Sequence, residues 1–241
     1  MKSLALILPI ALLWSFLRFA SQAPVDSNPL NTVLKKMDTA AAGFRTTQAE
    51  FEQDTYQKVI NDVDDVQTGT IYHRRSGKDI EMMAAFKKEG SDLKSLKPAP
   101  KYVLFSQGKV RVYQPKPDQV TEIDLSKDRS VESYVVLGFG GSGQDLLKTF
   151  EVTYVGPETI SGVATAKLQL VPKSDKVRNT YHRIFLWIDL ERGISVQQQF
   201  FTPQEDWRLA KYSSIRVNEK ISPDVFKLKT TSKTQTISPR G

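Results

Sequence analysis

The chain contains no cysteine and only two histidines, His73 and His182. Without cysteine it can form no disulfide, and it cannot carry a lipid anchor on a cysteine at a mature N-terminus. Zinc sites need Cys, His or acidic ligands at short spacings, and the two histidines lie far apart in sequence, so we expect no metal site. Both histidines are predicted to have structural or surface roles.

Motifs of nucleophilic catalysis are also missing. No G-x-S-x-G motif occurs, and the triplet Gly141–Gly143 has no strand before it that could form a nucleophile elbow. The acidic run Asn61–Asp65 resembles a calcium loop, but it lacks the glycine and the glutamate that such a loop needs. We interpret this run as a solvated hairpin tip, and we expect neither enzymatic activity nor a cofactor.

Long apolar runs are absent except at the N-terminus, where Met1–Ser3 precedes an apolar run over Leu4–Leu17. Small residues follow at Ser21 and Ala23. A positive start, a short apolar core and small residues at the cleavage positions are typical of a secretory signal peptide, so we expect residues 1–23 to be removed. The alternative is an uncleaved membrane anchor, but the run is shorter than the roughly twenty residues that span a hydrocarbon core.

The mature chain, residues 24–241, keeps 32 basic and 27 acidic residues, a net charge of about +5. Lys and Arg are scattered along it, which is typical of a solvated surface rather than a nucleic-acid groove. These residues contain no Pro- or Ser-rich linker and are numerous enough to predict a single domain with one large core. Export would place this domain outside the cytoplasm, where nucleic acid is not an expected partner.

The first predicted element of the mature chain is an amphipathic helix. Asn28 and Pro29 supply a cap and a first-turn proline, apolar residues recur at helical spacing after Leu30, and Gly43 ends the pattern. From Arg45 onward the apolar period changes to two, which predicts strands. The predicted strands are Thr47–Gln57, Thr68–Arg75, Asp79–Lys87, Tyr102–Ser106, Val110–Gln114, Gln119–Asp124, Glu151–Val155, Ala164–Val171, Arg183–Asp189, Ser195–Thr202, Arg208–Asn218 and Val225–Lys229.

Tight turns join many of these strands, so we expect consecutive strands to pair in one long antiparallel meander. Ser106–Lys109 and Glu191–Gly193 are the clearest turns, each with a glycine for the left-handed position. After the sixth strand, two short helices, Ser130–Leu137 and Gln144–Phe150, are predicted around the glycine-rich tract 138–143. No Lys–Ser/Thr pair comes directly after the last glycine of this tract, so we favour a flexible hinge between two lid helices over a phosphate-binding loop.

A sheet of this size must hide one face, and one-sided helices can cover it. The predicted fold class is therefore mainly β (α+β), an unclosed antiparallel β-barrel or strongly curved sheet with a helical lid. So many strands can curl around a cavity, whereas a smaller sheet would fill its own interior. This architecture favours the binding of an apolar molecule.

Several short motifs occur in a fixed order along the chain. They are Phe44–Phe51, Gly69 with Arg75 six residues later, the hairpin Ser106–Pro115, Leu146–Val152, Leu168–Lys173 and Asn218–Phe226. Together with the leader and the first helix, this order resembles the LolA-type lipoprotein carrier family of Gram-negative bacteria. The chain departs from the family pattern at Ser76, which replaces a proline, at Gln107, which replaces an aspartate, and in lacking the usual tryptophan on the following strand.

The resemblance implies an apolar cavity that receives the acyl chains of lipoproteins and carries them across the periplasm. The implied partners are acylated lipoproteins, an inner-membrane ATP-driven release complex and an outer-membrane acceptor. In the family, the arginine that matches Arg75 hydrogen-bonds to helix groups beneath the lid and holds the empty carrier shut. A plain surface arginine is the alternative, and the neighbouring Arg74 is a second candidate.

Alternating strand positions supply an apolar sleeve, although the same residues would equally suit a dry core. With Arg75, the predicted ligand-binding residues are Ile71, Ile80, Met82, Phe86, Val103, Phe105, Phe185, Trp187 and Phe200. Each acyl methylene left in water costs about 0.8 kcal/mol, so an acyl chain needs such a sleeve to cross an aqueous space. We therefore expect a periplasmic carrier that is non-enzymatic, and a monomer suits a shuttle. The alternatives are a carrier of another amphiphile, such as a glycolipid, a lipid-sensing signalling regulator, and an exported hydrolase.

Overall fold

The computed structural model describes residues 28–76, 79–125 and 137–238. The predicted signal peptide lies outside these residues, and so does the predicted helix Ser130–Leu137 except for Leu137, which is in a turn. Within the described residues, no helix has both the length and the apolar character needed to cross a membrane.

The predicted N-terminal helix is α1 (Pro29–Ala42). The side chain of Asn28 accepts a hydrogen bond from the Leu30 amide at 3.0 Å, which satisfies one of the free amides of the first turn. The buried side of α1 consists of Val33, Leu34 and Met37, at the spacing of one helix face.

Twelve strands form a single sheet within the described part of the chain. Eleven of them overlap predicted strands, and the acidic run Asn61–Asp65 lies at the end of the first hairpin, as expected. The strands are β1 (Thr46–Gln57), β2 (Asp62–Ser76), β3 (Asp79–Gly90), β4 (Lys97–Ser106), β5 (Lys109–Gln114), β6 (Gln119–Asp124), β7 (Phe150–Ile160), β8 (Val163–Pro172), β9 (Arg183–Asp189), β10 (Ser195–Phe201), β11 (Trp207–Val217) and β12 (Gln235–Ile237).

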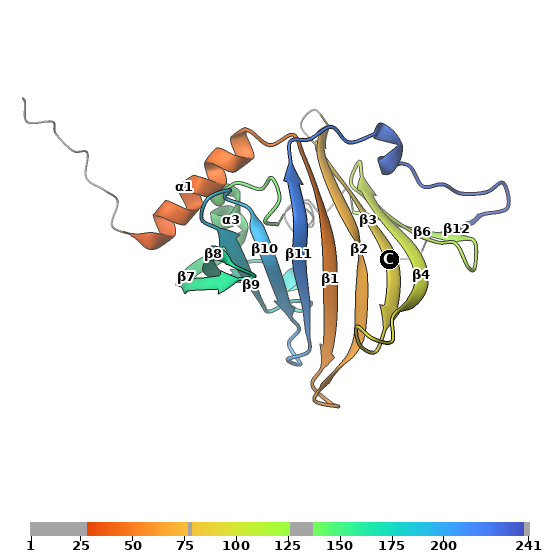
Figure 1. The fold of residues 1–241 in the computed structure, drawn as a ribbon, viewed down its shortest axis with the longest axis horizontal. Coiled ribbons are helices and arrows are strands. Elements are labelled where there is room, and N and C mark those ends of the chain that lie inside the picture. Colours follow the sequence, from red (N-terminus) through yellow and green to blue (C-terminus); the bar gives the residue numbers. More distant parts are fainter. Residues whose placement is uncertain (1–27, 77–78, 126–136, 239–241) are drawn as a thin grey trace, which may run out of the picture.

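The strand order is β12-β6-β5-β4-β3-β2-β1-β11-β10-β9-β8-β7 (Figure 1). The expected single meander is therefore wrong in one respect: the chain forms two antiparallel meanders, β1–β6 and β7–β11, which join where β1 pairs with β11. Among the described strands, β7 and β12 are the edges and do not pair with each other. The predicted fold class, an unclosed curved sheet with a helical lid, is confirmed.

The predicted strand Val225–Lys229 is wrong. A short 3-10 helix, η1 (Pro223–Phe226), occupies this position, because Ser222 caps it and Pro223 cannot donate to a strand ladder. Phe226 is buried with Met83 and Leu104. The chain then continues to β12, which pairs with β6 in parallel.

Two further helices follow the glycine-rich tract: α3 (Gly143–Thr149), which confirms the predicted Gln144–Phe150, and α4 (Asp175–Arg178). Gly143 allows α3 to approach α1 closely, because a Cβ there would lie 2.6 Å from the Leu34 carbonyl oxygen. Both predicted turns have their glycine at positive φ, Gly108 at 69° and Gly193 at 67°.

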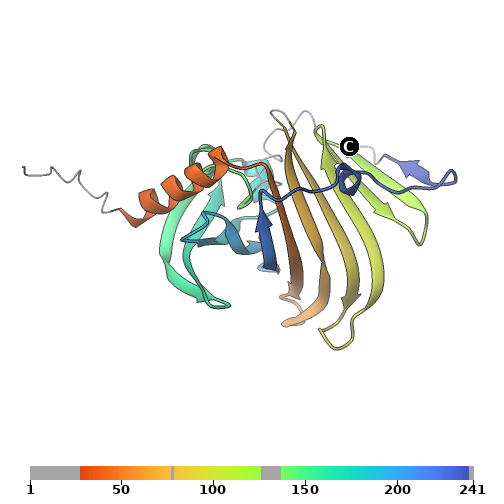
Figure 2. The ribbon, with the colours of Figure 1, turned by 45° about the horizontal axis from the view of Figure 1, so that its top comes forward.

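We call the sheet face that packs against α1 the inner face. The largest core cluster lies here, where Val33, Leu34 and Met37 pack against side chains of β8 and β9. Figure 2 shows α1 over the half of the sheet that contains β7–β10, and the C-terminal segment crossing the other half. The C-terminal segment covers part of the opposite, outer face through Phe226.

Candidate functional site

Seven of the ten predicted site residues share one face of β2, β3 and β4, because residues directly opposite each other in antiparallel strands lie on the same side of a sheet. The rows that pair across these strands are Arg75 with Ile80, His73 with Met82 and Phe105, Ile71 with Ala84 and Val103, and Gly69 with Phe86 and Lys101.

This face is the inner face. Gly69 also pairs with Phe51, which pairs in turn with Tyr212 of β11. The Tyr212 hydroxyl lies 3.2 Å from the side-chain oxygen of Gln198, and Gln198 pairs with Leu186 of the core beneath α1. The predicted residues of β2–β4 therefore continue the surface that α1 covers.

The exposure of these side chains differs along the face. Phe105 is only 1% exposed, whereas Ile71, Met82 and Val103 are half-buried. Two residues that the sequence analysis missed extend the surface onto β5, although the same alternation indicates them. We define the apolar strip as the inner-face side chains Ile71, Ile80, Met82, Ala84, Phe86, Val103, Phe105, Val110 and Val112.

Phe200 also lies on the inner face, but in the other half of the sheet. It pairs with Ile184 and packs against the core cluster beneath α1. Its ring meets that of Tyr181 with the centroids 5.2 Å apart. Phe200 therefore belongs to a filled core, separate from the apolar strip.

Phe185 and Trp187 lie on the outer face, so the structure does not bring them together with the strip. Their neighbour Leu186 points to the core, and strand side chains alternate. The Trp187 indole donates to the Glu158 carboxylate at 2.5 Å, and the Lys167 ammonium lies over both rings. The sequence did not show which side was inner because all five residues from 184 to 188 are apolar.

Arg75 joins β2 to the end of α1. Its guanidinium donates to the carbonyl oxygens of Phe44 at 3.3 Å and Ala41 at 3.4 Å, and it lies 5.8 Å from the centre of the Phe44 ring. The last turn of α1 contains no basic residue of its own. Arg75 thus supplies the positive charge that a helix C-terminus favours.

Arg74 has a different set of contacts. Its guanidinium pairs with Glu81 at 2.5 Å and lies 4.3 Å from the centre of the Phe226 ring. Arg74 therefore faces the C-terminal segment on the outer face, while Arg75 faces α1. Of the two candidate arginines, Arg75 is therefore the one that contacts the end of α1.

The start of the glycine-rich tract, where we expected a flexible hinge, is packed against the sheet. Gln198 donates to the Leu137 carbonyl at 2.6 Å, and the Ser195 amide donates to the Gly138 carbonyl at 2.9 Å. Phe139 is 1% exposed and lies against the rings of His73 and Tyr212. Burial at this site raises the pKa of the Tyr212 hydroxyl.

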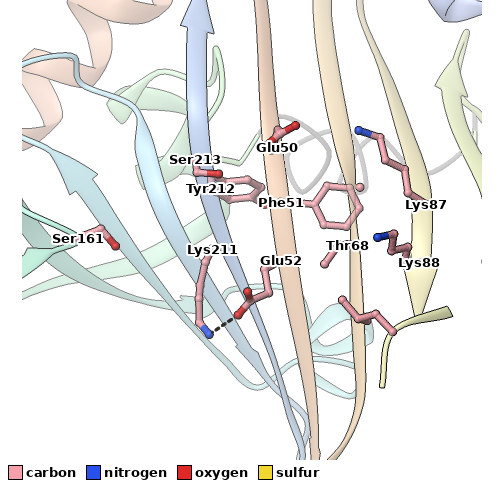
Figure 3. Close-up of a pocket in the computed structure, with 12 residues that line it drawn as sticks. Glu50, Phe51, Glu52, Thr68, Lys87, Lys88, Ser161, Lys211, Tyr212 and Ser213 are labelled. Carbon is pink, nitrogen blue, oxygen red and sulfur yellow. Dashed lines mark hydrogen bonds and ion pairs between the residues drawn. The ribbon is translucent and has the colours of Figure 1, made fainter. Parts of the chain in front are cut away.

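A pocket of about 510 Å³ lies by the central strands, where the two meanders join (Figure 3). Charged residues line much of it, including Glu50, Lys87 and Lys88, and an ion pair of 2.8 Å joins Lys211 to Glu52. This charged lining contrasts with the apolar side chains of the strip. Within the described chain, this pocket included, no group of three or more acidic or histidine side chains could hold a metal ion.

The sequence matches no family model and no curated protein. Solved structures with a similar fold include an uncharacterized conserved protein from Thermus thermophilus, with a TM-score of 0.51 and 9% identity over 88% of this chain and 100% of that one. MucB has a TM-score of 0.49 and 11% identity over 83% of this chain, which spans 62% of MucB.

A LolA superfamily protein from Nitrosomonas europaea, NE2245, has a TM-score of 0.39 and 11% identity over 83% of this chain and 97% of that one. At these identities the likeness is one of fold.

Proposed function

We propose that this protein is a periplasmic carrier that shields lipoprotein acyl chains on its inner face and moves them from the inner to the outer membrane. The apolar strip supports this proposal: it is a continuous apolar surface on the inner face, and most of its side chains are only half-buried. An acyl chain on the strip would leave water, which stabilises the complex by about 0.8 kcal/mol per methylene.

Arg75 would keep the empty carrier closed by holding the C-terminal end of α1. Its two hydrogen bonds, of 3.3 and 3.4 Å, are long for charged donors, so a ligand that displaces α1 loses little by breaking them. Cargo would come from an inner-membrane ATP-driven release complex and pass to an outer-membrane acceptor. This role requires shielding and release, and it needs no catalytic group.

Native mass spectrometry of the protein purified from its own periplasm, with lipid extraction of the bound material, tests the proposal. We expect an acylated lipoprotein. Recovery of a free lipid or glycolipid would instead indicate a carrier of another amphiphile.

Two substitutions locate the site. Val103→Lys places a charge in the apolar strip and should abolish recovery of the cargo. Thr68→Lys adds the same charge at a half-buried position that pairs with Glu52 on the outer face, and it should leave recovery unchanged. Equal loss in both variants, or an empty wild-type protein that also fails to bind a synthetic lipopeptide, would contradict the proposal.

A further inference from the structure

The apolar strip has a definite length along β3. Its inner-face side chains on this strand are Ile80, Met82, Ala84 and Phe86, which alternate with outward-facing residues. Six residue steps separate Ile80 from Phe86, so this part of the strip is about 20 Å long. One of its ends lies beside Arg75, which pairs with Ile80.

The other end of the strip is closed by aromatic rings. The rings of Phe51 and Phe86 meet edge to face with centroids 5.0 Å apart. Gly69 makes this contact possible, because a Cβ at that position would lie 2.6 Å from the Phe51 ring. The Lys101 ammonium lies 4.1 Å from the centre of the Phe86 ring and completes what we call the end wall: Phe51, Phe86 and Lys101.

Beyond the end wall the inner face becomes polar. Lys101 donates to the Gln67 side-chain oxygen at 3.2 Å, and Gln67 donates to Asp65 at 2.8 Å. Partial burial lowers the pKa of Lys101 and, together with the charge of Glu89, raises that of Asp65. An apolar chain that extended past Phe86 would have to cover these polar groups, which is unfavourable.

We propose that Phe86, supported by Phe51 and Lys101, determines the length of the acyl chain that the strip accepts. The occupant is a single unbranched acyl chain that lies along β3 between Arg75 and the end wall. This inference rests on the proposed function, since it requires that the strip bind an apolar chain. It adds a specificity-determining residue to that function.

The test uses the mature protein and a series of saturated fatty acids from octanoic to stearic acid, with dissociation constants measured by calorimetry. For the wild type, we expect affinity to rise about fourfold per methylene, which corresponds to about 0.8 kcal/mol, and then to stop rising at one chain length. Phe86→Ala should shift this break to longer acids, because the end wall is opened.

Phe185→Ala is the matched control, since it removes a half-buried ring of the outer face and should leave the break where it is. If Phe86→Ala fails to fold in a thermal melt, Phe86→Leu should produce a smaller shift in the same direction. An unchanged break in a folded Phe86 variant, or a wild type without a break, would overturn the inference alone. Failure of every acid to bind the wild type would contradict the carrier proposal and the inference with it.

Discussion

Adjacent residues of one strand can belong to different parts of this protein, and Arg74 and Arg75 are the clearest case. Strand alternation directs Arg75 to the end of α1 and Arg74 to Phe226 on the outer face. The sequence left open which arginine would meet the helix. Only the packing of α1 on one side of β2 decides it.

Arg75→Leu should loosen the end of α1, because two hydrogen bonds from a charged donor are lost. We expect the last turn of α1 to open more easily by about 1 kcal/mol, which would be measured as roughly fivefold faster hydrogen exchange over residues 37–44. Arg74→Leu is the matched control and should leave this exchange unchanged. Equal exchange in Arg75→Leu and the wild type would show that Arg75 does not stabilise the end of α1.

Gly69→Ala should destabilise the sheet, because a Cβ at this position would meet the Ala85 carbonyl oxygen at 2.3 Å as well as the Phe51 ring. We expect a loss of about 1–3 kcal/mol in the free energy of unfolding, measured in urea. Gly43→Ala is the control, since the nearest atoms to its Cβ would lie 3.9 Å away. A neutral Gly69→Ala would mean that both the Ala85 carbonyl and the Phe51 ring can move aside without cost.

At the scale of elements, the sequence was most informative where a local signal and the hydrophobic period agreed. α1 has a cap, a first-turn proline and one apolar face, and it was predicted almost to its ends. The prediction for the segment after Asn218 was wrong because its apolar residues suit either a strand or a helical turn. Pro223 at the start of η1 and the packing of Phe226 on the outer face favour the turn.

The turn between β9 and β10 depends on Asp189, whose carboxylate accepts from the amides of Glu191 and Arg192 and from the Arg192 guanidinium. Burial alone would raise the pKa of Asp189, but these donors hold its pKa below the ordinary value of 3.8. The ionised form is therefore favoured in the folded state. Its contribution is present above pH 3.8 and is lost as the pH falls through the lower, folded-state pKa.

Asp189→Asn should accordingly lower the free energy of unfolding at neutral pH by about 1–3 kcal/mol. The difference between this variant and the wild type should shrink as the pH falls from 3.8 through the lower, folded-state pKa, where the wild-type carboxyl becomes neutral too. Urea titrations over this range measure the difference. Asp175→Asn, on the exposed surface, should have little effect, and a difference that grew on acidification would contradict the prediction.

At the scale of the whole molecule, the two halves of the sheet differ in how deeply their inner faces are buried. In the half near α1, inner-face residues such as Leu168 and Ile184 are fully buried and form a core. In the other half, Ile71 and Val103 occupy equivalent positions but are half-buried. α1 and α3 pack on the first half, and the strip that we propose as the ligand site lies beside them.

A further prediction at this scale concerns the expected signal peptide, residues 1–23. The chain expressed with its own leader in a Gram-negative host should appear in the periplasmic fraction with Pro24 as its first residue, as determined by mass spectrometry. Leu8→Arg interrupts the apolar run and should retain the uncleaved precursor in the cytoplasm. A wild-type chain recovered uncleaved in the membrane fraction would favour the anchor instead.

The sequence alone determined eleven of the twelve described strands, the capped first helix and most of the apolar positions that alternate along β2–β4, because these features depend on local conformational preference and on period. It could not determine which side of a strand is inner where every position is apolar, as in Ile184–Ile188, nor that β1 pairs with β11. Those choices depend on long-range packing. Only the tertiary structure separated Phe185 and Trp187 from the apolar strip, because α1 packs against the face that carries Leu186, and strand alternation places these two rings on the opposite face.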